Sequence, residues 1–164
     1  MTTQGTRTSV LTEQFEAIAG ELRETIVRVP DDLWQARAAG DGRQVNVVAH
    51  HAASSLGPIA RQIQAMLEGR PRPLTMDQIH AGNAAHAQQF ASCSRAETLE
   101  VHDRGVAEAT AMLRGLTDEQ LAQEGEFLTG ARGTVEQVIE RVLIGHPREH
   151  NATIQATLNT SRMA

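Results

Sequence analysis

The chain has 164 residues, of which 40% are hydrophobic and 21% charged, and its formal net charge at pH 7 is -5. A chain of this length can bury one core without disulfides, and the composition is typical of a globular protein rather than a disordered one. With one tryptophan, three phenylalanines, no tyrosine and a negative net charge, it lacks the basic and aromatic surfaces of nucleic-acid-binding proteins, so nucleic acid is excluded as a partner.

Two long helices are predicted in the first half of the chain. Apolar residues recur every third or fourth position through residues 9–29, and Pro30 ends this stripe. The same period returns through residues 43–68, where Gly57 and Pro58 predict a kink. Both segments therefore present one apolar face to a core.

A shorter helix and two further long helices are predicted after residue 70. Thr75 and Gln78 have the spacing of a capping box, which predicts a helix through about Phe90, and Ser94 with Glu97 repeats the pattern before a third long helix. A turn, a short helical segment and a glycine-bounded loop are expected next. The last helix is predicted to begin near Thr134, and no strand-like alternation of useful length is present.

These elements predict an all-α protein, a four-helix bundle with a long crossover between helices two and three. We expect one domain over residues 1–164, with flexible tails at about 1–8 and 160–164. The first residues lack an apolar signal core, and no stretch approaches the roughly 18 apolar residues that span a bilayer. The single cysteine, Cys93, excludes an intramolecular disulfide and fits a reducing compartment, so we predict a cytoplasmic protein without membrane contact.

The candidate functional residues of this sequence are histidines. His146 and His150 lie four residues apart on the predicted last helix, so both rings reach the same face. If the crossover makes helices two and four antiparallel, His50 lies about 10 Å below one end of the bundle and the pair about 15 Å below the same end. His50, or its neighbour His51, can then meet the pair.

Three neutral imidazoles leave a coordination position open on a divalent ion, as catalytic sites do. We therefore predict a metal site formed by His50, His146 and His150. Imidazole suits several metals, with Zn or Ni the foremost candidates and Fe the next. The alternative is a pair of ordinary core histidines, which would have to find polar partners among apolar neighbours.

Two familiar metal motifs do not fit. An H-x-x-E-H peptidase needs an acidic ligand downstream, but none of the fourteen residues after His150 is Asp or Glu. Ferritin-like di-iron sites need paired Glu-x-x-His motifs, which the chain lacks. Pro147 between the two histidines either adjusts their aim or merely interrupts the helix, and the sequence leaves both readings open.

Other polar residues receive simpler interpretations. We expect His102 to be a hydrogen-bonded core histidine, His80 and His86 to be exposed, and Cys93 to be a packed or surface thiol rather than a nucleophile. Arginines at positions 61, 70 and 72 could bind a carboxylated thiol substrate, but solvated arginines are the ordinary case.

Three segments resemble the DinB-like superfamily. "QVNVVAHHAAS" is similar to the second-helix motif of that family, "GTVEQVIERVLIGHPREHNATIQ" to its final helix, and "MDQIHAGNAAHAQQF" to its middle. The resemblance runs from about residue 10 to 158. It implies a four-helix bundle in which three histidines hold one divalent metal, commonly assembled as a homodimer; matched residue by residue, it puts the second-helix ligand at His50.

The resemblance also implies candidate functions. Characterised members include transferases that use mycothiol, bacillithiol or glutathione and a mycothiol-dependent isomerase. The first hypothesis is thus a metal-dependent thiol transferase or isomerase, with a low-molecular-weight thiol as co-substrate and an electrophilic small molecule as substrate. The alternatives are a non-catalytic protein that binds a metal or small molecule for stress protection, and a helical dimer with vestigial histidines. No catalytic side chain is assigned.

Overall fold

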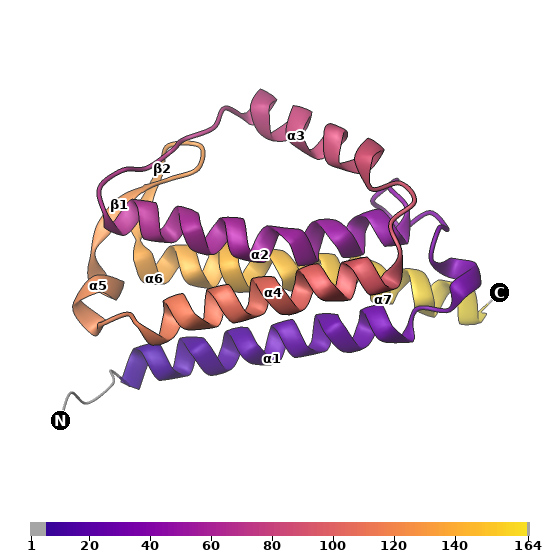
Figure 1. Cartoon of the computed structure of the whole chain (residues 1–164), viewed down its shortest axis with the longest axis horizontal. Coiled ribbons are helices and arrows are strands. Elements are labelled where there is room, and N and C mark those ends of the chain that lie inside the picture. The colour runs from indigo at the N-terminus through magenta and orange to yellow at the C-terminus, as the bar shows by residue number, and fades with distance from the viewer. Residues whose placement is uncertain (1–5, 164) are drawn as a thin grey trace.

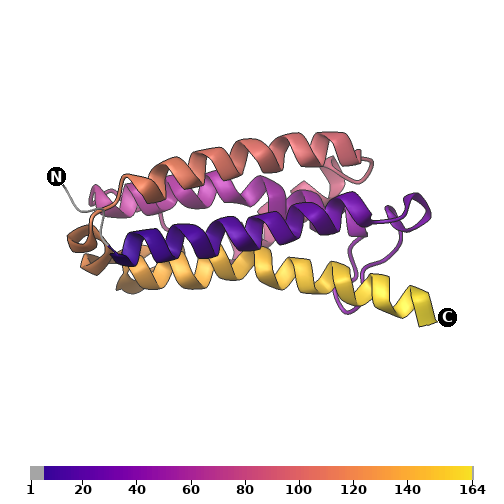
Figure 2. The same cartoon turned by 90° about the horizontal axis from the view of Figure 1, so that it is seen from below.

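The computed structural model describes residues 6–163, and four long helices dominate it. The helices are α1 (Thr6–Arg28), α2 (Val45–Leu67), α4 (Arg95–Arg114) and a final helix that combines α6 (Val135–Val138), a π-helical segment η2 (Ile139–Ile144) and α7 (Gly145–Met163). In Figures 1 and 2, α1 and the final helix run in one direction, while α2 and α4 run in the other. The predicted all-α bundle is therefore confirmed. Its second and third long helices, α2 and α4, are parallel, as the long crossover between them predicted.

The long crossover contains α3 (Met76–Gln89), which passes over α2 from one end of the bundle toward the other (Figure 1). Its start is the predicted capping box: Thr75 Oγ1 accepts the Gln78 backbone N–H, and the Gln78 side chain accepts the Thr75 N–H. No residue of α3 is fully buried. Its half-buried residues recur at helical spacing, which turns one narrow face toward the bundle: Ile79, Asn83, His86, Ala87 and, at its C-cap, Phe90.

A small antiparallel hairpin was not predicted. After the short helix α5 (Asp118–Ala122), β1 (Glu124–Phe127) pairs with β2 (Ala131–Thr134). The sequence predicted only a glycine-bounded loop here, because four-residue strands are too short to show a reliable alternation of side chains. Gly130 has φ 80°, the left-handed conformation that a tight connection favours, and buried Phe127 anchors the hairpin to the core.

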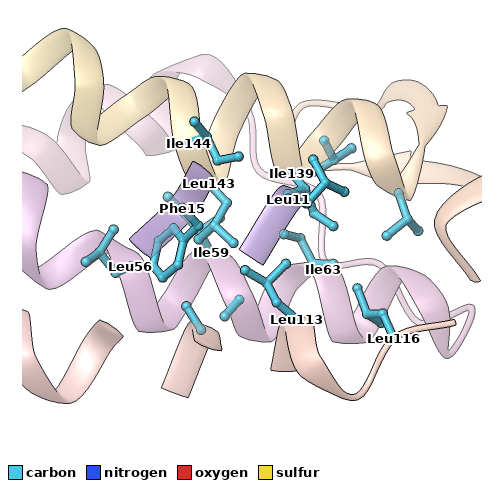
Figure 3. Packing of buried hydrophobic residues seen from close by; sticks show 14 of the residues in the cluster. Leu11, Phe15, Leu56, Ile59, Ile63, Leu113, Leu116, Ile139, Leu143 and Ile144 are labelled. Atoms are coloured by element: carbon cyan, nitrogen blue, oxygen red, sulfur yellow. The ribbon is translucent and has the colours of Figure 1, made fainter. Parts of the chain in front are cut away.

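The apolar core fills the bundle in two neighbouring clusters. Figure 3 shows the larger one, in which Leu11 and Phe15 of α1 meet Ile63 of α2 and Leu143 of η2. The smaller cluster, around Leu22, Ile26, Trp34, Val48 and Ile154, lies toward the other end.

Helices α2 and α4 approach closely at Gly105. A Cβ atom at this position would lie 3.0 Å from Leu56 Cβ and 3.3 Å from the Ala53 carbonyl oxygen. The glycine therefore permits the close parallel packing that fixes the position of α2 in the bundle.

The ends of the described chain are helical. Residues 6–8 belong to α1 and residues 160–163 to α7, whereas the predicted tails also include residues 1–5 and 164, which lie outside the described residues. Within residues 6–163, no helix combines the length and apolar character that crossing a membrane requires.

Candidate metal centre

His146 and His150 lie one turn apart near the start of α7, and their ring centroids are 4.4 Å apart. Both side chains are half-buried on the side of the final helix that faces α2. The predicted pair on one helix face is therefore present.

The third histidine beside this pair is His51 of α2. Its ring centroid is 5.0 Å from that of His146 and 5.0 Å from that of His150, with interplanar angles of 67° and 90°. One nitrogen from each ring lies within 4.8 Å of the others. Nitrogen ligands of one tetrahedral zinc ion lie about 3.4 Å apart, so the rings are close to a coordinating arrangement.

His50, the residue expected in this set, points elsewhere. It is 3% exposed, its Nδ1 lies 2.9 Å from Nε2 of His86, and its ring stacks on Phe90 with a centroid distance of 3.8 Å. Consecutive helical residues point about 100° apart, so only one of two adjacent histidines can face α7. The structure thus brings His51, the alternative that the sequence left open, to the pair in place of His50.

His86 of α3 covers the cluster from a third helix. Besides its contact with His50, its Nε2 lies 3.5 Å from Ser54 Oγ, and its ring is edge-on to that of His51 at 5.4 Å. The prediction that His86 is exposed was wrong, whereas that for His80 is confirmed. The signal that could have found it is the spacing of His86 and Phe90, one turn apart on the inward face of α3.

All five of these histidines have pKa values below the ordinary one. Desolvation is the main cause for His51, whose pKa falls to about 3, and the neighbouring His146 and His150 lower it further. Desolvation, followed by the charge of His146, likewise lowers the pKa of His150 to about 4. The three clustered imidazoles are therefore neutral near pH 7, the form that binds a metal.

The cluster also contains a buried polar atom that makes no hydrogen bond to the described residues. His146 Nε2 is buried and has no partner among the described residues, although buried polar atoms are nearly always paired. A divalent cation would satisfy this atom and draw the three lone pairs together. The donor set and its orphaned nitrogen therefore fit a metal ion.

The backbone departs from α-helical geometry just before these ligands. In η2 the Gly145 N–H donates to the Glu140 carbonyl five residues earlier. Pro147 has no N–H to donate to Leu143 and would crowd that carbonyl in a regular α-helix, so a widened turn precedes it. Beyond this turn α7 continues unbroken to Met163, which means that the helix is distorted rather than ended.

Several other predicted residues lie outside the cluster. His102 is a buried core histidine whose Nε2 lies 2.9 Å from the Ala19 carbonyl oxygen and whose Nδ1 lies 3.1 Å from Asp103 Oδ1. Arg61 pairs with Glu108 and Arg70 with Glu68, so neither points at the histidines.

Cys93 and Asn46 tie the linker between α3 and α4 to the start of α2. The Asn46 amide donates to the Ala91 carbonyl at 2.9 Å, and the Cys93 thiol donates to the Asn46 carbonyl at 3.5 Å. Burial raises the pKa of the Cys93 thiol. This cysteine is therefore a packed group and not an activated nucleophile.

Comparison with known proteins identifies the family of the chain. The sequence model described as the DinB superfamily matches residues 14–154 of this chain. The chain belongs to the DinB superfamily. No curated protein matches its sequence.

Solved structures resemble this DinB protein in fold. Mycothiol-dependent maleylpyruvate isomerase is similar with a TM-score of 0.73 and 9% identity, over 90% of this chain and 60% of that chain. The Sibling Lethal Factor Precursor DfsB is similar with a TM-score of 0.73 and 14% identity, over 98% of this chain and 99% of that chain. An uncharacterized protein from Clostridium difficile 630 has a TM-score of 0.67 and 12% identity, with coverages of 93% and 95%. This chain thus spans only 60% of the length of the isomerase.

Proposed function

We propose that this DinB protein is a divalent-metal-dependent enzyme that transfers a low-molecular-weight thiol to an electrophilic small molecule or isomerises one through a thiol adduct. The observation that carries the proposal is the convergence of His51, His146 and His150 from two antiparallel helices. The structural similarity to a mycothiol-dependent isomerase makes thiol chemistry the first reaction class to test. Zn or Ni is the proposed metal, with Fe as the next candidate.

The three histidines would hold the ion through neutral imidazoles. A divalent ion held there supplies positive charge that lowers the pKa of a nearby thiol and polarises an electrophile. Three protein ligands leave room for a small molecule, whereas a structural zinc site is usually closed by four.

The remaining residues of the site hold and cover the cluster. The His50–His86 contact and the stacking of His50 on Phe90 attach α3 to α2 above His51, which limits the access of water from that side. No cysteine or carboxylate belongs to the three-residue cluster that the described chain forms, so the attacking group would come from the thiol substrate.

A non-catalytic binder is the second candidate. It is favoured by the pairing of His50 with His86, because this pairing occupies the two nearest imidazoles that are not proposed as ligands. In that case the same cluster would sequester a metal ion or a reactive small molecule without turnover.

Turnover distinguishes the two candidates. The purified chain would be stripped with a chelator, reloaded with Zn²⁺ or Ni²⁺, and mixed with 1-chloro-2,4-dinitrobenzene and mycothiol, bacillithiol or glutathione. We expect catalytic loss of free thiol that needs metal and disappears in His150→Ala, while His80→Ala, which changes an exposed histidine of α3, keeps it. Stoichiometric binding without turnover would support the binder, and no metal uptake would contradict both.

The homodimer and the cytoplasmic location stay predictions. Sedimentation of the metal-loaded chain would test the first, since a homodimer has twice the 17.8 kDa mass of the chain. Fractionation of cells that express the protein would test the second.

A further inference from the structure

An open hollow of about 510 Å³ lies at the start of α2. Val47 and Ala87 form part of its lining. Val47 is one helical turn before His51 on α2, and Ala87 follows His86 on α3, so this wall adjoins His51, one of the proposed metal ligands. The opposite wall is the segment between η1 (Asp31–Leu33) and α2.

The charge of the hollow is positive. Its lining includes Arg37 and Arg43 and no acidic residue. Asp41 neutralises part of this charge through its ion pair with Arg43, which leaves a net charge of about one positive unit. A small molecule in the hollow would therefore meet the positive field of these arginines.

Arg43 is held in a fixed orientation. Its Nε donates to Asp41 Oδ1 at 2.6 Å and its Nη2 to Asp41 Oδ2 at 2.8 Å, while its carbonyl oxygen accepts the Ala38 N–H at 2.8 Å. The arginine side chain is 26% exposed. This paired edge leaves the N–H groups of Nη1 for a ligand, and a guanidinium held in this way loses little freedom on binding an anion.

Arg43 also lies close to the start of the helix that carries His51. It precedes α2 by two residues and lines the same hollow as Val47, whose side chain is one helical turn from that of His51. An anionic group bound by Arg43 would place the rest of a small molecule next to the cluster.

We propose that this hollow is a carboxylate subsite in which Arg43, positioned by Asp41, binds an anionic group carried by the thiol or by the electrophile. The proposal rests on the proposed function, because it assumes that the remainder of the molecule reacts at the histidine cluster. It limits the substrate class to pairs in which at least one member is a carboxylate of small size.

Matched pairs of ligands test the subsite without turnover. One pair is 3-mercaptopropionate and 3-mercaptopropionamide, which places the charge on a thiol; the other is crotonate and crotonamide, which places it on an electrophile. Binding would be measured from the rise in Tm of the metal-free full-length chain at millimolar ligand and constant ionic strength. Titration of the chain loaded with Co²⁺ would then follow the thiol-dependent near-ultraviolet absorption.

We expect the wild-type chain to bind the acid of at least one pair about tenfold more tightly than its amide. Arg43→Gln should remove this preference, and Arg61→Gln, which changes an arginine paired with Glu108, should keep it. Arg43→Lys keeps the positive charge but lacks the planar guanidinium group, so it should keep part of the preference for the acid over its amide. This second variant preserves the test if Arg43→Gln does not fold.

Equal affinity of the wild-type chain for acid and amide in both pairs would overturn the subsite, as would a preference that survives Arg43→Gln. A preference confined to one pair identifies which substrate carries the charge. Failure of the chain to take up metal would contradict the proposed function but not the subsite, because the Tm measurement uses no metal. The two failures are thus distinguishable.

Discussion

Lowering the pH from 7.5 to 5.5 should destabilise the metal-free protein. In the folded chain the pKa values are about 3 for His51 and about 4 for His150, against 6.5 for an unperturbed histidine. Between these values the unfolded chain takes up protons that the folded chain does not. Stability is therefore fully present above pH 6.5 and is lost progressively as the pH falls toward 4.

The magnitude follows from the same pKa values. One pH unit below the unfolded pKa, each histidine that stays neutral in the folded state lowers the free energy of unfolding by about 1.4 kcal/mol. His51 and His150 together give about 3 kcal/mol, which solvent screening reduces to about 2 kcal/mol. The lowered pKa values of His50, His86 and His146 act in the same direction.

Urea unfolding with a chelator present, at pH 7.5, 6.5 and 5.5, measures this effect. Trp34, the single tryptophan, is 8% exposed and provides the fluorescence signal. A chain in which His51 and His150 are both replaced by alanine should lose the part of the pH dependence that these two residues give, about 2 kcal/mol, and keep the part that the other three histidines give. The reasoning is refuted if the wild-type free energy of unfolding is unchanged or rises between pH 7.5 and 5.5, or if the double variant keeps the full slope.

Two further predictions concern the elements around the site. His86→Ala should raise the rate of amide hydrogen exchange throughout α3, because it removes the contact with His50. The metal affinity of this variant should stay within about tenfold of wild type. An unchanged exchange rate in α3 would contradict the proposed covering role of His86. Gly105→Ala should lower the free energy of unfolding by about 1–3 kcal/mol, since the new methyl group would press on Leu56. Gly57→Ala, which meets only the movable ends of the Glu108 and Arg61 side chains, is the matched control in urea unfolding, and equal losses in the two variants would refute the close-approach argument.

The helical bundle was predictable because its signals are local and repeated. The apolar stripes of α1 and α2 and the capping boxes at Thr75 and Ser94 each predict an element that is present. The β1–β2 hairpin carried no comparable signal. Its strands are short, and it is anchored through Phe127, a contact that depends on the folded bundle.

The sequence predicted a histidine cluster at this place, but it did not determine which of the two adjacent histidines of α2 faces the pair on α7. The spacing of His146 and His150 determines their shared face, whereas the choice between His50 and His51 depends on how α2 is rotated about its axis. That rotation is fixed by the packing of α2 against α4 and by the contact of His50 with α3, which join residues distant in sequence. Arg43 was missed for the same reason, because its nearness to the cluster arises from the loop before α2.

The affinity for Zn²⁺ or Ni²⁺ of two variants at adjacent positions tests the central claim most directly. Structural zinc sites bind with about 10–16 kcal/mol through four ligands, so the loss of one ligand corresponds to about 3 kcal/mol, or roughly a hundredfold. His51→Ala should weaken metal binding by at least this factor, while His50→Ala, which loses a hydrogen bond and a stacking contact, should stay within about tenfold of wild type. Metal binding that survives His51→Ala and is lost in His50→Ala would contradict the account.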